Sequence, residues 1–288
     1  MTVRNLIEQK LAELSSSEKR IARLITERYP VSALGGIEDI ARQTQVSAPT
    51  VTRFVRRLGF DRFVDFQRAI RFEVQDAEVS PLALLTKHQA HAPLAGHMGD
   101  GAMIADLTAS IAQLAAKPVT DAMDLAADMI AGAKARVWVL GGRWSSIAAQ
   151  YLAFQLTSLR GEVYALTQPA SGVMEDRIAD FTRRDVLVAY DFRRYQPEVI
   201  AFCNAAHQRG VRIILLTDPD LSPICDVASV TIPVPVATTS PLDTLAPTIA
   251  ATDALLARLV TRLGGQATTR MAVLERLRRA TSVPADKL

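Results

Sequence analysis

Apolar residues recur at intervals of three and four positions near the start of the chain. This spacing over residues 3–14 and 17–28 predicts two amphipathic helices, because positions three or four apart share one face of an α-helix. Ser17 is the expected N-cap of the second helix, which should end before Tyr29 and Pro30. Together the two helices would form a small helical support for the elements that follow.

A shorter pair of helices is predicted next, after the break at Gly35 and Gly36. Residues 37–44 (IEDIARQT) have helical periodicity, residues 45–47 form a turn, and a further helix runs from residue 48 to about residue 58. Helices of about eight and eleven residues that flank a turn of three or four residues are typical of the helix-turn-helix unit. The N-terminal part of the chain therefore has the pattern of an all-α helix-turn-helix domain.

The predicted helix at 48–58 has two different faces. One narrow stripe is apolar and should be buried: Val51, Phe54, Val55 and Leu58. The opposite face is polar, with an expected N-cap at its tip. Short polar groups at a helix N-terminus can approach base edges in the major groove, and arginine can bind guanine or phosphate. We assign to the bases Ser47, Pro49, Thr50 and Arg53, and to the phosphates Arg56, Arg57 and Arg62.

Charge is distributed unevenly along the chain. Its net charge is +3, and residues 1–75 hold 13 Lys and Arg against 9 Asp and Glu, whereas the remainder holds 20 against 21. Residues 42–71 contain seven arginines and only two acidic residues, Asp61 and Asp65. A positive surface of this kind attracts nucleic-acid phosphates, although a charged helix face can also be merely solvated. Double-stranded operator DNA is the expected partner, and a helical interaction module that does not bind DNA is the alternative.

From residue 136 onward the pattern changes to apolar strands that alternate with helices. The segments predicted as strands are 137–140, 162–166, 185–190, 211–217 and 228–234. Helices are predicted at 145–159, 173–182, 197–208 and 243–263 and, before the first strand, at 102–115 and 119–133. Strands that alternate with helices indicate a doubly wound α/β domain with a five-stranded, mostly parallel sheet.

Ligands of such sheets bind outside the carboxyl ends of the strands, so the residues there are candidates. After the first strand, the run GGRWSS combines a tight turn with serines at a helix N-terminus, which can bind an anion. After the third strand, DFRRYQ has two arginines for a phosphate or carboxylate. The candidates for binding a small anionic effector are Gly142, Arg143, Ser145, Ser146, Asp191, Arg193, Arg194, Thr217 and Ser240. The chain lacks a G-x-G-x-x-G motif, which disfavours a nicotinamide site.

Part of the chain resembles a known family of regulators. The run from residue 40 to residue 70 carries Ala41, Val46-Ser47, Thr50, Arg53, Leu58-Gly59-Phe60 and Phe66. These residues match the pattern of the helix-turn-helix in RpiR-family transcriptional regulators, whose members couple this domain to a sugar isomerase (SIS) domain. The resemblance covers nearly all of residues 1–76 and implies a DNA-binding regulator.

The segment from about residue 126 to residue 265 resembles the SIS domain, which binds phosphosugars in that family. The resemblance implies a phosphate contact for Ser145, which matches the serine after the first strand. The usual Ser-x-Ser-Gly-x-Thr loop after the third strand is replaced by residues 190–195 (YDFRRY). This replacement removes small hydroxyl donors and adds two permanent charges. The implied effector is therefore a small anion such as a sugar phosphate or a sugar acid.

The expected organisation has three parts. Residues 1–76 form the DNA-binding domain, 77–125 a connector with helices, and 126–288 the SIS-like effector-binding domain with a C-terminal helical tail. A homodimer or homotetramer is expected, because a helix-turn-helix normally binds two half-sites. A cytoplasmic location is expected, since the N-terminus lacks a signal peptide pattern and no apolar run approaches the roughly 20 residues of a membrane span.

The alternative function for the α/β domain is catalysis, as a sugar-phosphate isomerase or lyase. Such an enzyme needs a general base, and the loops after the strands offer Asp191 and Asp218 but no histidine or glutamate. We therefore expect no enzyme activity. Neither a cofactor nor a metal is expected, because the two cysteines lack the spacing of a zinc or redox site, and His88 with His91 lacks a third ligand.

Overall fold

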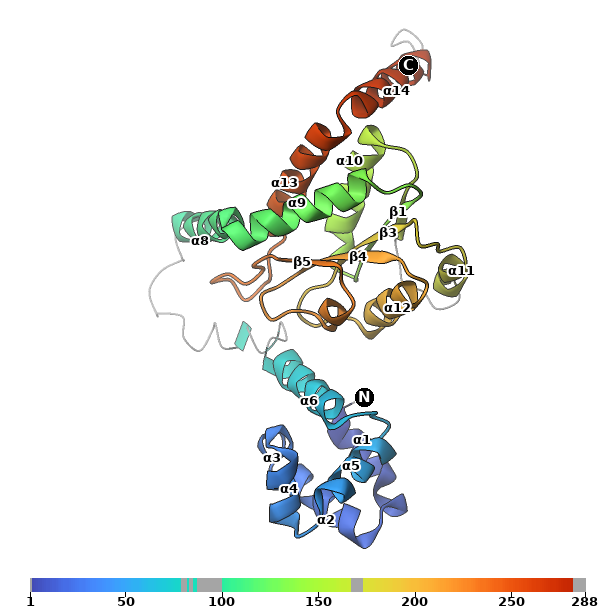
Figure 1. The fold of residues 1–288 in the computed structure, drawn as a ribbon. Coiled ribbons are helices and arrows are strands. Elements are labelled where there is room, and N and C mark those ends of the chain that lie inside the picture. The colour runs from blue at the N-terminus through green and yellow to red at the C-terminus, as the bar shows by residue number, and fades with distance from the viewer. Residues whose placement is uncertain (1, 79–81, 83–84, 87–99, 167–172, 282–288) are drawn as a thin grey trace. The chain divides into compact units, whose positions relative to one another are not determined.

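The chain divides into two compact units, residues 1–87 and residues 88–288. The computed structural model describes residues 2–78, 82, 85, 86, 100–166 and 173–281 (Figure 1). His88 and His91, considered above as metal ligands, lie outside the described residues. Within the described ranges, His, Cys, Asp and Glu form no group that could hold a metal ion, and each helix is too short or too polar to cross a membrane.

All elements described in the first unit are helices. They are α1 (Val3–Lys10), the 3₁₀-helix η1 (Leu11–Glu13), α2 (Ser16–Glu27), α3 (Val31–Leu34), α4 (Ile37–Thr44), α5 (Ala48–Arg57) and α6 (Phe63–Glu78). Helix α4, the turn and α5 confirm the predicted helix-turn-helix unit. Gln45 ends α4 in a left-handed conformation (φ 52°), which turns the chain toward α5.

The first two helices differ in detail from the prediction. Helix α1 ends at Lys10 and is followed by η1, so it is shorter than the predicted helix over 3–14. Helix α2 is capped by Ser15 and not by Ser17. The Ser15 hydroxyl accepts a hydrogen bond from the Glu18 N–H (3.4 Å), and the Glu18 carboxylate accepts one from the Ser15 N–H (2.8 Å). This capping box satisfies two backbone donors, whereas Ser17 lies inside the first turn.

The core of the first unit contains the predicted apolar stripe of α5. The buried members of this stripe are Val51, Phe54, Val55 and Leu58. The ring of Phe66 lies at the centre of an aromatic group, with its centroid 5.6 Å from that of Phe60 and 5.9 Å from that of Phe63. These phenylalanines pack in the core, so they are not available to stack on bases.

The second unit contains a five-stranded sheet. Its elements are α8 (Asp100–Ala112), η2 (Gln113–Ala115), α9 (Lys117–Ala131), β1 (Val137–Gly141), α10 (Ser146–Leu159), β2 (Val163–Leu166), α11 (Val173–Ala179), β3 (Val186–Tyr190), α12 (Pro197–Gln208), β4 (Arg212–Thr217), η3 (Pro223–Asp226), β5 (Val230–Pro233), α13 (Ala246–Leu263) and α14 (Gly265–Thr281). The strand order is β2-β1-β3-β4-β5, and each neighbouring pair is parallel. Helices α8 and α9 pack against α13, which places them in this unit and not in the connector expected at 77–125.

Helices cover both faces of the sheet, as the alternation of strands and helices predicts (Figure 1). One face packs on α9, α10 and α13 through residues such as Val139, Leu152 and Leu255. The other face packs on α12 through residues such as Leu187 and Val199. Because all strands run in one direction, α10, α12 and α13 begin where β1, β3 and β5 end. We call this end of the sheet, with its connecting loops, the carboxyl edge.

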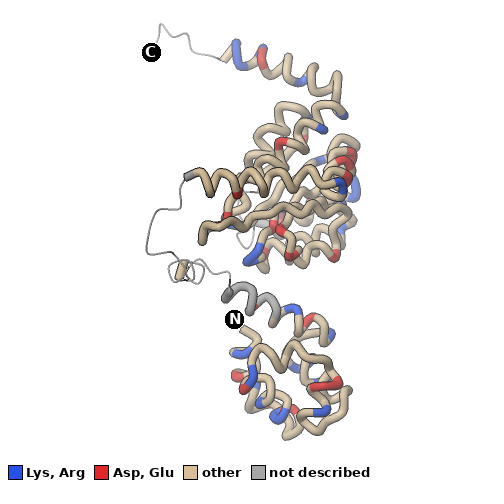
Figure 2. Tube along the Cα trace, turned by 90° about the vertical axis from the view of Figure 1, so that its left-hand side faces the viewer, with Lys and Arg blue, Asp and Glu red and all other residues tan. Residues whose placement is uncertain are grey.

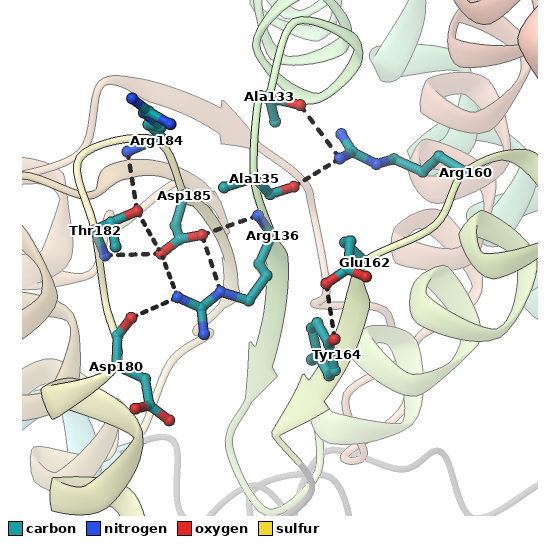
Figure 3. A network of polar contacts seen from close by, with 10 residues as sticks. All are labelled: Ala133, Ala135, Arg136, Arg160, Glu162, Tyr164, Asp180, Thr182, Arg184 and Asp185. Atoms are coloured by element: carbon teal, nitrogen blue, oxygen red, sulfur yellow. Dashed lines mark hydrogen bonds and ion pairs between the residues drawn. The ribbon is translucent and has the colours of Figure 1, made fainter.

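A buried polar network lies at the opposite end of the sheet, where β1 and β3 begin (Figure 3). The fully buried Asp185 carboxylate accepts hydrogen bonds from the backbone N–H groups of Arg136 (2.9 Å) and Thr182 (2.7 Å). The Arg136 guanidinium forms an ion pair with the same carboxylate (3.3 Å) and donates to the Asp180 carbonyl (2.5 Å). These contacts join the segments that precede β1 and β3, so the role of Asp185 is structural.

Candidate functional site

The N-terminal end of α5 is exposed to solvent. Ser47 occupies the predicted N-cap position in an extended conformation, but its hydroxyl group contacts the Thr50 hydroxyl (2.9 Å) and not a backbone N–H. The Arg53 guanidinium donates to the same Thr50 oxygen (3.1 Å). Ser47, Pro49 and Arg53 are exposed, and Thr50 is half-buried. The tip of α5 therefore presents hydroxyl groups and a guanidinium to solvent.

Arg56 and Arg62 are also exposed but have different partners. The Arg56 Nε donates to the carbonyl oxygen of Asp61 (3.4 Å), which leaves most of the guanidinium in solvent. Arg62 binds both carboxylate oxygens of Asp65 (3.0 and 2.9 Å) at the start of α6. Figure 2 shows both basic and acidic positions on the first unit. The excess of positive charge over residues 42–71 is thus partly offset by local ion pairs.

Arg57 connects α5 with the helices before it. Its guanidinium donates to the Glu13 carbonyl oxygen (2.9 Å) and lies 3.4 Å from the carboxylate of Glu18, whose side chain is 7% exposed. Burial acts to raise the pKa of Glu18, but hydrogen bonds from Ser15 and the charges of Arg57 and Arg53 outweigh burial and lower it. Arg57 was assigned to phosphate from the sequence alone, and the structure adds a role in holding α5 to its neighbours.

The loop after β1 uses its polar groups internally. The Ser145 hydroxyl, which is buried, donates to the Tyr190 carbonyl (2.6 Å) and accepts from the Gly142 N–H (2.8 Å). The Ser146 hydroxyl donates to the Arg143 carbonyl (3.2 Å). The loop is thereby joined to the end of β3, and both serine hydroxyls form hydrogen bonds within the protein.

Gln196, which the sequence analysis did not select, closes this loop from the α12 side. Its side-chain oxygen accepts from the Arg143 N–H (2.6 Å). A Cβ atom on Gly142 would lie 2.2 Å from the same oxygen, so a larger residue here would require the Gln196 side chain to move. In the sequence, Gly142 was the signal that another group could approach the loop after β1 closely. The glycine did not identify Gln196 as that group.

Two buried carboxylates lie at the ends of β3 and β4. Asp191 accepts from the Ser222 hydroxyl (2.5 Å), and Asp218 accepts from the Tyr195 hydroxyl (2.8 Å) and the Arg193 N–H (2.5 Å). Burial is the main cause that raises the pKa of Asp191 to about 7, and the charge of Asp218 adds to it. Burial also raises the pKa of Asp218. These carboxylates connect the loops of the carboxyl edge to one another.

The remaining candidates lie at the same edge but differ in exposure and in hydrogen-bond partners. The Arg193 side chain is 17% exposed and forms an ion pair with Asp243, in the loop before α13. Arg194 is exposed and has a positive φ of 66°, which turns the loop. The buried Thr217 hydroxyl accepts from the Ser222 N–H (3.0 Å). Ser240 accepts from the N–H of the leucine two residues further on (3.2 Å), so its hydroxyl stabilises its own turn.

The raised pKa of Asp191 predicts a dependence of stability on pH. Since the folded protein holds this proton to a higher pH than the unfolded chain, the contribution to stability is present below the unfolded pKa and is lost as the pH rises through about 7. We expect the free energy of unfolding to fall as the pH rises to about 7, and we expect the fall to be smaller in Asp191→Asn. Urea denaturation at several pH values measures the free energy of unfolding. An equal slope in Asp191→Asn and in the exposed control Asp220→Asn would contradict the assignment.

Two family models match the chain. Residues 1–77 match the helix-turn-helix domain of the rpiR family, and residues 129–258 match the SIS domain. An uncharacterized HTH-type transcriptional regulator of Clostridium perfringens is 25% identical over 224 residues, which are 78% of this chain and 78% of that protein. The bifunctional protein glk of Paraburkholderia xenovorans is 30% identical over 240 residues, which cover 78% of this chain. The chain spans 34% of the length of that glk protein.

Solved structures share the fold. The sugar isomerase domain of an RpiR transcription factor from Sphaerobacter thermophilus has a TM-score of 0.54 and 23% identity, and the match covers 68% of this chain and 98% of that chain. The Vibrio vulnificus NanR protein, complexed with ManNAc-6P, has a TM-score of 0.52 and 17% identity, and the match covers 98% of this chain and 100% of that chain. The second unit thus has the SIS-type α/β fold.

Proposed function

Because this chain belongs to the RpiR family of helix-turn-helix regulators and carries a SIS domain, we propose that it binds operator DNA through α5 and responds to a small anion. The observation that carries this proposal is the division of α5 into a buried face and an exposed polar tip. The anion binds at the carboxyl edge of the second unit and changes the affinity for DNA. The protein acts in the cytoplasm, where its operator is found.

The exposed tip of α5 supports the DNA-binding part of the proposal. Ser47, Thr50 and Arg53 form a chain of hydrogen bonds that brings the Arg53 guanidinium over the first turn, where a recognition helix contacts base edges. Arg56 and Arg62 would bind phosphates, and Arg62 would exchange its contact with Asp65 for a phosphate oxygen. Arg57 would contribute less, since its guanidinium already binds groups of the same chain.

The carboxyl edge supports the effector-binding part. The arginines Arg193 and Arg194 follow β3, the loop after β1 contacts the last residue of β3, and the loop after β4 contacts the loop after β3. The similarity in fold to NanR, which was solved with ManNAc-6P, favours a ligand of the sugar type with an acidic group. Catalysis is less well supported, because Asp191 and Asp218 are buried and hydrogen-bonded to Ser222 and Tyr195.

Self-association is a further part of the proposal, as a homodimer or a dimer of dimers. Helix α10 contains no charged residue, yet Ile147 is 57% and Phe154 is 72% exposed on its outer side. An uncharged apolar face does not repel a copy of itself, and a helix-turn-helix needs a second copy to bind two half-sites. A second copy of this chain therefore covers α10.

The substitution Phe154→Glu is expected to weaken this self-association by about 100-fold or more, because it would place a charge in a desolvated interface. Analytical ultracentrifugation over a range of protein concentrations measures the change. The matched control is Leu125→Glu, which changes a residue that is 58% exposed on α9 and should leave the oligomer intact. Identical sedimentation of Phe154→Glu and the wild type would rule out α10 as the interface.

Selection of binding sites from random DNA duplexes tests the DNA-binding part. The selected sequences should contain two related half-sites with centres about 10 to 11 base pairs, or a multiple of that, apart. Binding should also weaken steeply with salt, because basic side chains release counterions from phosphates. A failure to enrich any duplex, with no salt-dependent binding, would reject the proposed function.

A further inference from the structure

The ion pair between Arg193 and Asp243 joins two loops of the carboxyl edge. Arg193 follows β3, and Asp243 lies in the loop between β5 and α13, 50 residues further along the chain. Their side chains are 17% and 13% exposed. A buried arginine is expensive unless a charged partner compensates it, and here the partner is a carboxylate of the same protein.

Several other groups that could bind an anion at this edge are already engaged, whereas the guanidiniums of Arg143 and Arg194 are exposed. The Gly142 N–H donates to the Ser145 hydroxyl, and the Arg143 N–H donates to the Gln196 side chain. The Ser145 hydroxyl donates to a backbone carbonyl. A phosphate needs donors for three oxygens. In the loop after β1, the donors named above already bind groups of the protein. A carboxylate needs fewer donors, and the planar guanidinium fork of one arginine matches its two oxygens.

Two buried polar atoms at this edge find no partner among the described residues. The Arg193 Nε is one, so the guanidinium retains an unused donor beside its contact with Asp243. The other is the hydroxyl of Thr248, a fully buried residue in the first turn of α13. The N-terminus of a long helix favours negative charge, and the Asp243 carboxylate lies just before it in the chain. This region therefore accommodates an acidic group.

We propose that the effector is a small carboxylic acid whose carboxylate replaces that of Asp243 on Arg193. This inference rests on the proposed function, because it assigns the ligand class of the same carboxyl edge. Asp243 is then an internal competitor of the effector. An effector with a phosphate as its acidic group would fit less well, because the guanidiniums left to bind it beside Arg193, those of Arg143 and Arg194, are exposed to solvent.

The exchange has a consequence for the loop that carries Asp243. The same loop is bonded to α8, since the Asp106 carboxylate accepts from the Thr239 N–H (2.7 Å). Release of Asp243 removes the contact of the loop with β3 while the contact with α8 remains. Helix α8 is the first helix described in the second unit, so this loop connects the ligand position with the part of the unit nearest in sequence to the DNA-binding domain.

Chemical rescue tests the exchange without knowledge of the natural effector. The full-length variant Asp243→Ala removes the internal carboxylate, and free acetate should take its place on Arg193. We expect 100 mM sodium acetate, about ten times an assumed Kd, to raise the Tm of Asp243→Ala by about 3–6 °C relative to sodium chloride of equal ionic strength. The Tm of the wild type should not respond, and inorganic phosphate should act less than acetate.

Control variants separate binding at this position from a general effect of charge. Asp220→Ala removes a nearby exposed carboxylate that acts on Arg193 through its charge, whereas Asp243 forms the ion pair, so acetate should not raise the Tm of this variant. The double variant Arg193→Gln with Asp243→Ala should lose the rescue. If Asp243→Ala does not fold, Asp243→Ser replaces it. The serine leaves room for acetate and keeps a polar side chain.

The outcomes distinguish this inference from the proposed function. An acetate response that is absent from both Asp243 variants, or equal in Asp220→Ala, would overturn the inference, and a larger response to phosphate would overturn the carboxylate class. Rescue by acetate with no effect of any acid on DNA binding would support the position on Arg193 but reject the proposed function. Ligand-dependent DNA binding without rescue would reject this inference alone.

Discussion

Replacement of Arg53 by alanine is expected to weaken binding to the selected operator by about 10- to 100-fold, equivalent to about 1–3 kcal/mol. The guanidinium is exposed at the tip of α5, where it donates to Thr50 and acts on Glu18 only through its charge, so the fold depends little on it. The same helix buries Val51 and Phe54 on its other face, and these contacts remain. The loss should therefore appear in affinity and leave the free energy of unfolding unchanged.

Fluorescence anisotropy with the operator duplex and with an unrelated duplex measures this effect. The loss should be larger for the operator, because a base contact distinguishes sequences and a phosphate contact does not. Arg57→Ala is the matched control on the same helix. Its guanidinium binds Glu13 and Glu18, so this variant should lose about 1 kcal/mol of stability with little loss of sequence preference. Operator affinity that is unchanged in Arg53→Ala would refute the assignment of the base contact.

Replacement of Asp185 by alanine should have the largest effect on stability. We expect a loss of about 3–5 kcal/mol in the free energy of unfolding of the second unit, because the partly buried Arg136 guanidinium and two backbone N–H groups would lose the fully buried carboxylate that they bind. The network joins the segments before β1 and β3, so its loss weakens the centre of the sheet (Figure 3). Both tryptophans, Trp138 and Trp144, lie in this unit, and their fluorescence therefore reports its unfolding in urea.

Asp180→Ala is the control for this measurement. Asp180 accepts from Arg136 through its backbone carbonyl, and its side chain is exposed, so the substitution should change stability by less than about 0.5 kcal/mol. A loss below about 1 kcal/mol in Asp185→Ala would mean that the network is not required for the sheet.

Local signals were sufficient to predict the helix-turn-helix and, within one or two residues, the strands and several helices of the second unit. The predicted helix at 37–44 coincides with α4, and the helix predicted from residue 48 coincides with α5 within one residue. Here a glycine pair, an apolar stripe and a polar turn agree. Helix α12 was also predicted at its observed bounds, since Pro197 favours the first turn of a helix and Gly210 follows its end.

The cap of α2 shows where residue type alone misleads. Ser15, Ser16 and Ser17 are equally good N-caps by type, and the prediction chose the last of them. The distinguishing signal was Glu18, which lies three positions after Ser15 and completes a capping box only with that serine. The error shifted the N-cap by two residues and did not affect the fold.

The positions of the site residues were predictable, but their partners were not. The alternation of strands and helices brings Ser145, Asp191 and Arg193 to one end of a parallel sheet. Their contacts depend on residues far away in sequence: Gln196 lies 53 residues from the backbone group it binds, and Asp243 lies 50 from Arg193. Periodicity contains only local information. That the expected anion donors bind groups of the same chain could therefore be found only from the tertiary structure.

The central claim is that one chain couples operator binding to the binding of a small acid. The most direct test is the Kd for the selected operator, measured with and without each sugar acid or sugar phosphate that raises the Tm of the protein. We predict that at least one of these acids changes the Kd by about 5- to 150-fold, as expected for a coupling free energy of about 1–3 kcal/mol, and that Arg193→Gln abolishes the change. An operator Kd that stays the same with every acid that binds the protein would contradict the account.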